Sequence, residues 1–536
     1  MSSNLREVLS GMQSSQWYDH FKGALYPLNL DLCRSKVQEK YHVKSLLQIA
    51  ADYIVLDSTM TSNAVNILPQ ELCTVLMQQA LEKNKDRAID VLLSRWPLQT
   101  LSLKKFTPNI YTNLAILHDH VELSRVAKQG LRYTTSVAHN FLETLKKKTS
   151  TRLKCIDLTG YPTAEVITYY LATHCMLAHN EARQNLMIRK YEEAIQLLPP
   201  EEAHSRLERF TTDQSLPDDY FHVKLDVFIS SEPALAEVCK ALKVSAFEES
   251  TLRLVVEKLD VTCMGYQKIH VLLEQVNTEY LLGLRLKYNS IGSAQFTHLT
   301  PILCKFTNLV SLDLSCNCIN AYQNDLTVDA LITVFKYLKC LVRLDLSNNR
   351  LKSKLRRILG SIEKPLVFLR LAGCGLTLED MTYLSLSHHA TGLKELDISE
   401  NGLRGSVGML LLLLQNVKSQ LCVLELEDTF LTDHQFELLG PYIKQLASLL
   451  YLNISGNSAS SEKLYQFGQC CAILPDLQYI CMSYARDVYQ SEAEESEMKQ
   501  QFAFTLADEI IKEQKRLGLK TRVPTIVLSE LDQEMG

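Results

Sequence analysis

The chain has 536 residues, of which 46% are hydrophobic and 22% are charged, and its formal net charge is −5. This composition excludes a disordered chain, and the length calls for more than one core or for a repeat array. The small net charge gives no reason to expect nucleic acid as the main partner, and the most apolar run, "VGMLLLLLQNV", is too short to cross a membrane.

The N-terminal residues have no apolar core of signal-peptide length, and the chain contains fifteen cysteines. We therefore expect free thiols in a reducing compartment, namely the cytoplasm, with the nucleus as a second location. The closest cysteine pairs, at residues 316/318 and 470/471, have no partner at zinc-ligand spacing, so we expect no metal and no other cofactor.

Residues 41–145 follow an N-terminal extension (1–40) and show helical patterns with short breaks. The stretch "SLLQIAADYI" (45–54) places apolar residues on one helix face, at Leu46, Ile49, Ala50, Tyr53 and Ile54. That face either packs against the rest of this chain or binds a different protein.

A second helical element begins fourteen residues after Ile54, with "LPQELCTVL". Its pattern is φ-P-x-x-φ-x-x-x-φ, formed by Leu68, Pro69, Leu72 and Leu76. Proline suits the first turn of a helix, where its missing N–H costs nothing. The following helix should end at Trp96-Pro97, and a strand is expected after it.

The C-terminal half is a repeat. Seven segments fit L-x-x-L-x-L-x-x-N/C/T-x-L, and they start at Leu281, Leu309, Leu341, Leu366, Leu393, Leu421 and Leu449. The alternating leucines predict a short strand with one buried face, and position 9 (usually Asn) can bond the backbone where the strand ends. A period near 28 residues leaves room for a helix after each strand. The pattern predicts an α/β leucine-rich-repeat solenoid, a horseshoe of the ribonuclease-inhibitor kind, behind an all-helical N-terminal module.

Fainter copies start at Leu153 and Leu252, so we expect the horseshoe to cover residues 146–490. An insertion at about 196–220 is expected to form a surface loop. Residues 491–536 should contain an acidic linker, a helix and a final strand, "VPTIVL", that caps the array.

Positions 3, 5, 7 and 8 of each repeat should point into solvent from the concave side. Early repeats are basic there, and later ones are acidic. Either the charges only keep this surface hydrated, or the carboxylates steer a basic segment of a partner. On the second interpretation, the candidate partner-binding residues are Arg285, Lys287, Asp345, Arg370, Glu395, Asp397, Glu400, Glu425, Glu427 and Asp428.

The sequence contains no phosphate-binding glycine loop, no G-x-S-x-G and no H-E-x-x-H motif. The pair His388–His389 is expected to be a solvated loop pair. We therefore expect no catalytic residues.

The order of segments such as "ILPQELCTVLMQQAL", "AIDVLLSRWPLQTLSL" and "KPLVFLRLAGCGLTLEDMTYLSLSHHATGLKELDISENGL" resembles the PRAME family (preferentially expressed antigen in melanoma). Within the family, the chain is most similar to the branch of leucine-rich-repeat-containing protein fourteen. The resemblance implies a substrate receptor of a cullin-two ubiquitin ligase, bound to elongin B/C and to an unidentified client protein.

For the elongin-binding box S/T/P/A-L-x-x-x-C-x-x-x-φ, the resemblance implies Ser45, Leu46, Ala50 and Ile54, with Ala50 where Cys is usual. For the cullin box it implies Leu68, Pro69, Leu72 and Leu76. As an alternative, "SLLQIAADYI" is a capping helix of the repeat array. The alternative function is that of a stoichiometric inhibitor of a signalling or transcription factor, for example in innate immune or NF-kappa-B signalling, without ligase activity.

Overall fold

The computed structural model describes residues 44–106, 120–146, 152–160, 165–179, 189, 192–193, 195–196, 198–213, 220–246, 251–489 and 495–531. The chain divides into two compact units, Met1–Leu281 and Leu282–Gly536. The extension 1–40 lies outside the described residues.

In the first unit, the described residues from 44 onward start with four short helices, α3 (Leu46–Ile54), α4 (Ser58–Ile67), α5 (Gln70–Glu82) and α6 (Asp86–Ser94). Helix α3 packs on α4 and α5, and α6 packs on α4, α5 and the long helix α8 (His120–Lys146). The core between them contains Met77, Ala80, Ile89 and Leu93, which are fully buried. The buried Trp96 follows α6 and donates its indole N–H to the carbonyl of Thr100 at 3.2 Å.

Four parallel strands complete this unit, in the order β1 (Thr100–Ser102), β2 (Cys155–Asp157), β3 (Phe221–Ile229) and β4 (Leu252–Val261). Strands β3 and β4 are longer than those of a standard repeat. Their helices are α9 (Glu165–His179), α11 (Pro200–Asp213), α12 (Glu232–Ser245) and α13 (Tyr266–Gln275), and the 3-10 turn η1 (Leu103–Lys105) follows β1. Of these, α9 and α12 pack on each other and on β4.

The second unit is the predicted leucine-rich-repeat solenoid. Each of the seven repeats gives one three-residue strand, and the segment that follows the seventh repeat gives a strand of five residues. These strands are β5 (Gly283–Arg285), β6 (Ser311–Asp313), β7 (Arg343–Asp345), β8 (Phe368–Arg370), β9 (Glu395–Asp397), β10 (Val423–Glu425), β11 (Tyr451–Asn453) and β12 (Tyr479–Ser483). Neighbours pair in parallel and in sequence order, and β13 (Thr525–Ser529) pairs with β12 as the predicted final strand.

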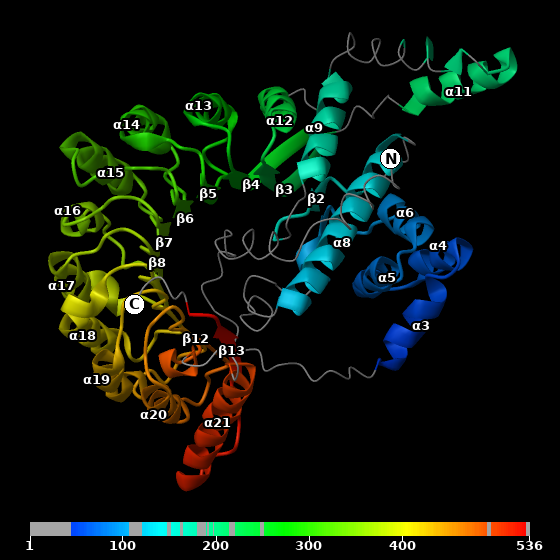
Figure 1. Cartoon of the computed structure of the whole chain (residues 1–536). Coiled ribbons are helices and arrows are strands. Elements are labelled where there is room, and N and C mark those ends of the chain that lie inside the picture. The colour runs from blue at the N-terminus through cyan, green and yellow to red at the C-terminus, as the bar shows by residue number, and fades with distance from the viewer. Residues whose placement is uncertain are drawn as a thin grey trace. The chain divides into compact units, whose positions relative to one another are not determined.

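Helices or 3-10 turns follow the strands and line the outer side of the arc that the second unit forms in Figure 1. They are α14 (Gly292–Leu303), α15 (Asp325–Tyr337), α16 (Leu355–Leu359), α17 (Leu378–Leu386), η3 (His388–Thr391), η4 (Leu403–Ser406), α18 (Val407–Val417), α19 (Asp433–Ile443), α20 (Ser461–Cys471), η5 (Arg486–Tyr489) and α21 (Glu495–Arg516). The repeat leucines of position 4, such as Leu284, Leu312 and Leu344, are buried between the strands and these helices.

The residue at position 9 closes each turn as predicted. The amide of Asn317 donates to the carbonyls of Leu286 (2.7 Å), Leu314 (3.0 Å) and Ser315 (3.0 Å), while its oxygen accepts from the N–H of Asn289. Thr429 takes this place through its hydroxyl, which donates to the Leu426 carbonyl at 2.9 Å. The position-9 side chains of the second to fifth and the seventh repeats thus join their own turn to the preceding repeat, namely Asn317, Asn349, Cys374, Asn401 and Asn457.

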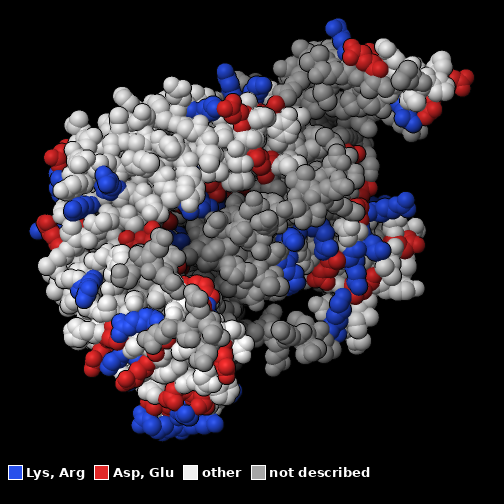
Figure 2. Space-filling model, viewed as in Figure 1, with Lys and Arg blue, Asp and Glu red and all other residues white. Residues whose placement is uncertain are grey.

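Helix α21 is followed by a left-handed glycine, Gly518, with the N–H of Leu519 bonded to the carbonyl of Gln514 at 2.9 Å. Lysine and arginine side chains gather at this end of the helix (Figure 2). Lys515 and Arg516 lie in its last turn, where cations offset the negative end of the helix dipole.

Three expectations about the architecture need correction. Among the described residues the parallel strands begin with β1, because Thr100 pairs with Cys155, so the sheet starts well before residue 146. The expected loop at 196–220 contains α11, favoured by Pro200 and Glu201 in its first turn. Residues 495–497 of the acidic run form the start of α21 rather than a linker, since acidic residues stabilise a helix N-terminus.

Candidate protein-binding surfaces

Helix α3 exposes an apolar face. It starts with a capping box, in which the Ser45 hydroxyl accepts from the N–H of Gln48 at 3.2 Å and the Gln48 side chain accepts from the N–H of Ser45 at 2.9 Å. Leu46, directly after the cap, is 86% exposed, and Ile49, Ala50 and Tyr53 are exposed on the same face. Ile54 is only half-buried. Ser45 thus fixes the helix start, and Leu46 leads an apolar stripe.

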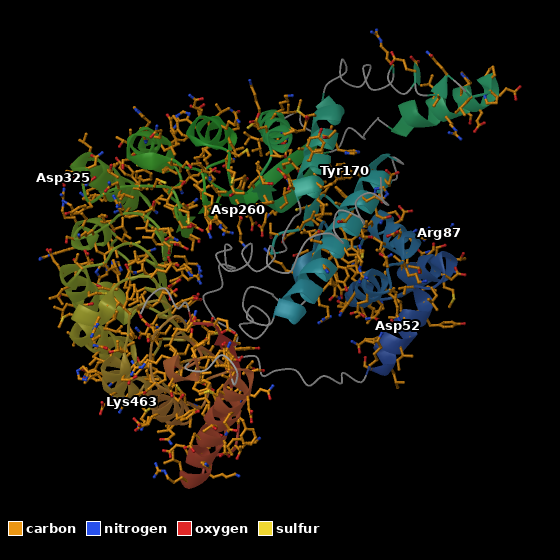
Figure 3. All side chains as sticks on the ribbon, in the orientation of Figure 1. Asp52, Arg87, Tyr170, Asp260, Asp325 and Lys463 are labelled. Atoms are coloured by element: carbon orange, nitrogen blue, oxygen red, sulfur yellow. The ribbon has the colours of Figure 1, made fainter. Side chains whose placement is uncertain are left out.

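The opposite face of α3 holds the helix in the bundle. Ala51 and Val55 are buried. Asp52, labelled in Figure 3, accepts from the ammonium of Lys44 at 2.6 Å, and that ammonium also donates to Gln79 of α5 at 3.2 Å. The helix is therefore anchored without using the stripe, which contradicts a role for Leu46 in sealing the end of the array.

The predicted cullin-box residues divide between the surface and the core. Pro69 is exposed at the N-cap of α5, one position before the expected first turn, and Leu68 and Leu72 are half-buried. Leu76 is 2% exposed and belongs to the core, so it is unavailable to a partner. The reason is helical spacing: Leu76 shares the inward face with Cys73 and Ala80, whereas Pro69 precedes the helix.

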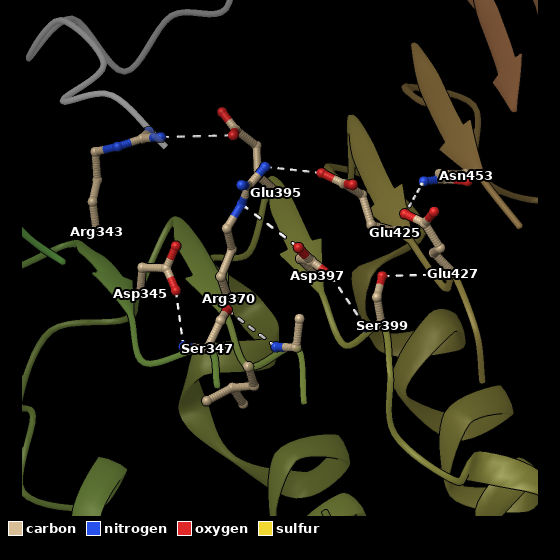
Figure 4. A network of polar contacts seen from close by, with 12 residues as sticks. Arg343, Asp345, Ser347, Arg370, Glu395, Asp397, Ser399, Glu425, Glu427 and Asn453 are labelled. Atoms are coloured by element: carbon tan, nitrogen blue, oxygen red, sulfur yellow. Dashed lines mark hydrogen bonds and ion pairs between the residues drawn. The ribbon is translucent and has the colours of Figure 1, made fainter. Parts of the chain in front are cut away.

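The charged inner face of the strands is not the solvent-facing surface that was expected. Arg285, Asp345, Glu395 and Asp397 are buried, and Glu425 is only 1% exposed. Arginines of earlier strands neutralise the later carboxylates (Figure 4): Arg343 lies 3.6 Å from Glu395, and Arg370 lies 3.8 Å from Asp397 and 2.9 Å from Glu425. In-register parallel strands are close enough for a guanidinium to reach across one or two neighbours.

Phe368 supports both arginines. The guanidinium of Arg343 lies 4.2 Å from the centre of its ring, and that of Arg370 lies 5.2 Å from it. A further pair joins Arg285 to Asp313 at 3.1 Å. These contacts make the inner strand face an internally paired network.

Burial and neighbouring carboxylates perturb the acids of this network. Burial, followed by the charge of Asp313, raises the pKa of Asp345 to about 7. Burial and the charge of Glu425 raise the pKa of Asp397 to about 6, against the opposing effect of Arg370.

The remaining predicted partner-binding residues lie where the strands end. Glu400 is exposed, and Lys287, Glu427 and Asp428 are half-buried. Glu427 accepts from the amide of Asn453 at 3.0 Å. Sequence reasoning did not include Tyr322, Arg350 and Lys352, which are exposed in the adjoining turns. The sequence signal for Arg350 and Lys352 was a basic residue on each side of the last leucine of the third repeat, at positions 10 and 12.

Residues 221–527 match the model of the PRAME C-terminal domain, which is more than half of the chain. The chain belongs to the PRAME family. It is 25% identical to leucine-rich repeat-containing protein 14 of Xenopus laevis over 464 residues, covering 83% of this chain and 89% of that protein. It is 29% identical to the human protein of that name over 249 residues, covering 45% of this chain and 50% of that protein.

This PRAME-family chain is also similar in fold to solved leucine-rich-repeat structures. A leucine-rich repeat-containing protein, LegL7, of Legionella pneumophila matches with a TM-score of 0.36 and 17% identity, covering 58% of this chain and 91% of that one. A chain from the yeast complex of Rad7 and Elc1 matches with a TM-score of 0.35 and 13% identity, covering 83% of this chain and 88% of that one.

The histidine pair of this PRAME-family chain is structural rather than a solvated loop pair. His389 is fully buried: its Nδ1 accepts from the N–H of Leu366 at 3.2 Å, and its Nε2 donates to the carbonyl of Leu359 at 3.0 Å. His388, its exposed neighbour, bonds the carbonyl of Ile362 at 3.0 Å. Burial lowers the pKa of His389 to about 4, which keeps the imidazole neutral.

Within the described ranges, no group of three or more His, Cys, Asp or Glu side chains could hold a metal ion, and the cysteines are free thiols. Among the helices described, none combines the length and the apolar character needed to cross a bilayer.

Proposed function

We propose that this chain is a non-enzymatic substrate receptor of a cullin-two RING ubiquitin ligase, which binds elongin B/C through α3 and a client protein through its repeats. The observation that carries the proposal is the exposed stripe of α3. A leucine that is 86% exposed at the start of a capped, anchored helix is placed to enter an apolar pocket of a partner.

The position of the proposed cullin box in the bundle also supports the proposal. Pro69 is the N-cap of α5, and α5 packs directly on α3, so the two boxes belong to one helical bundle. The repeats would then hold the client near the ligase. The receptor itself needs no catalytic group, because it raises the local concentration of client at the site of ubiquitin transfer.

The test is recovery of endogenous elongin B/C with the tagged full-length chain. We expect Leu46→Glu to reduce recovery at least thirtyfold, about 2 kcal/mol, as for the loss of a hot-spot side chain. Ile67→Glu is the matched control, because Ile67 is a comparably exposed (82%) apolar residue of the same bundle outside both boxes. It should leave recovery unchanged.

If wild-type chain recovers no elongin at physiological expression levels, the proposal is wrong, and the stoichiometric inhibitor remains as the interpretation of the repeat surface. Equal losses for Leu46→Glu and Ile67→Glu would also contradict it, since they would indicate a general effect on the bundle.

A further inference from the structure

The turns that follow the strands of the second unit share an unusual backbone conformation. The residue at position 8 of all seven repeats is left-handed, with φ between 50° and 71°: Tyr288, Cys316, Asn348, Gly373, Glu400, Asp428 and Gly456. Glycine and asparagine adopt this conformation at little cost, whereas tyrosine does so rarely. A left-handed tyrosine carries backbone strain, and such strained residues cluster at binding sites.

Tyr288 belongs to a surface that we call the rim patch, formed by Lys287, Tyr288, Tyr322, Arg350 and Lys352. Tyr288 and Tyr322 are 54% and 44% exposed. Each ring carries a lysine: the Lys287 ammonium lies 4.6 Å from the Tyr288 ring centre, and the Lys352 ammonium lies 5.0 Å from that of Tyr322. Both rings are thus held in place, and part of each ring remains exposed to a binding partner.

Backbone bonds connect the two parts of the patch. The N–H of Tyr322 donates to the carbonyl of Arg350 at 3.1 Å, which holds these turns side by side. On the other side, the N–H of Gly292 donates to the carbonyl of Asn317 at 2.8 Å, and the N–H of Cys316 donates to that of Ser347 at 2.9 Å, so the turns of the first three repeats are joined. The residues of the patch therefore lie on hydrogen-bonded turns of three successive repeats.

The three cations of the rim patch have no carboxylate partner in the described part of the chain. The ion pairs there include neither Lys287, Arg350 nor Lys352, whereas the nearby Lys354 and Arg357 pair with Asp325 on the helical side. Farther along the same row of turns the charge reverses, with Glu400, Glu427 and Asp428 in the fifth and sixth repeats. An anionic ligand would be attracted at one end of the row and repelled at the other.

We propose that the rim patch binds a short acidic segment of a protein, with aliphatic or aromatic side chains of that segment resting on Tyr288 and Tyr322. The reversal of charge along the row favours a short peptide stretch over a nucleic acid, whose phosphates continue without interruption. The inference rests on the proposed function only in assigning this segment to the client. The binding itself needs neither elongin nor cullin.

The experiment is fluorescence anisotropy of the purified full-length chain with a labelled peptide in which glutamates surround a leucine and a phenylalanine. We expect micromolar binding that weakens with salt, and about tenfold weaker binding for the double variant Arg350→Glu/Lys352→Glu. Lys305→Glu/Lys336→Glu is the matched control, because it makes the same charge change on exposed residues of the preceding α14–α15 region. It should bind like the wild type.

A second variant separates binding from folding. Tyr288→Gly relieves a left-handed tyrosine, so the midpoint of thermal unfolding should stay equal or rise, while peptide affinity falls severalfold. Failure of the wild type to bind, or equal losses in both charge-reversal doubles, would overturn the proposal. Equally tight binding of single-stranded DNA would overturn it too, by showing a general polyanion surface.

The two proposals fail separately. Leu46→Glu should bind the peptide like the wild type, and Arg350→Glu/Lys352→Glu should recover elongin B/C like the wild type.

Discussion

Arg370 on β8 lies 2.9 Å from Glu425 on β10, although strand β9 separates them. The same guanidinium is 3.8 Å from Asp397 on that intervening strand. One cation therefore serves two buried carboxylates on successive strands, and its removal should leave both in a site with little water.

We expect Arg370→Met to lower the free energy of unfolding by about 3 kcal/mol, because breaking a buried ion pair leaves uncompensated charge. Urea unfolding at pH 7.5 measures this loss. The triple variant Arg370→Met/Asp397→Asn/Glu425→Gln should recover most of the stability, since it removes the orphaned charges together with the arginine. If the single variant is as stable as the wild type, the network contributes nothing.

The buried His389 should make stability depend on pH. Its pKa of about 4 in the folded chain lies below the ordinary value of 6.5, so the folded state binds this proton less readily. The contribution is complete above pH 6.5 and is lost as pH falls toward 4, by about 3 kcal/mol in total.

His389→Gln can keep both backbone bonds without titrating, so it should lose less stability than the wild type between pH 7 and pH 4.5. Asp345 and Asp397 act in the opposite direction over this range, because their raised pKa values favour the folded state as pH falls. They are present in both proteins, so the difference between the two urea titrations isolates His389. Parallel pH profiles would contradict the assignment.

Gly456 should be intolerant of a side chain. Its φ is +71°, and a Cβ there would lie 1.7 Å from a carboxylate oxygen of Asp428. We expect Gly456→Ala to cost about 2 kcal/mol of folding free energy or more, measured by thermal or urea unfolding.

Gly408, which lies in the exposed part of α18 with nothing near its Cβ position, is the control. Gly408→Ala should raise stability by up to about 1 kcal/mol, because alanine is the better helix former. Equal effects of the two substitutions would show that neither the left-handed conformation nor the contact with Asp428 matters.

Substitution of Ala50 by cysteine should strengthen binding to elongin B/C. It is exposed on the stripe of α3 and stands where the box usually has cysteine. If the stripe enters a pocket, Ala50→Cys should add about 0.8 kcal/mol of buried contact, or about fourfold in affinity for purified elongin B/C, with no loss of fold stability. Calorimetric titration of elongin B/C with the wild type and with Ala50→Cys measures this difference in affinity. Unchanged affinity would place Ala50 outside the contact.

The repeats could be predicted because they are periodic. Each L-x-L gave a strand, and Asn317 and Thr429 closed their turns as their chemistry required. The burial of the charged side chains on the inner strand face could not be predicted. The alternation of apolar and polar residues within one strand does not indicate whether an arginine two strands away reaches the same carboxylate. The cullin-box pattern likewise could not show that Leu76 faces inward. The exposure of Leu46 depended on Lys44, Asp52 and Gln79, which hold the other side of α3.

The contact of Asn317 with both its own turn and the repeat before it has an evolutionary consequence. Asn349, Asn401 and Asn457 make the same two kinds of contact as Asn317, so duplication or loss of one whole period at these junctions leaves equivalent hydrogen bonds on both sides. Genes of this design can therefore change the length of their array in single recombination steps, while the specialised first strands and the closing helix α21 stay in place.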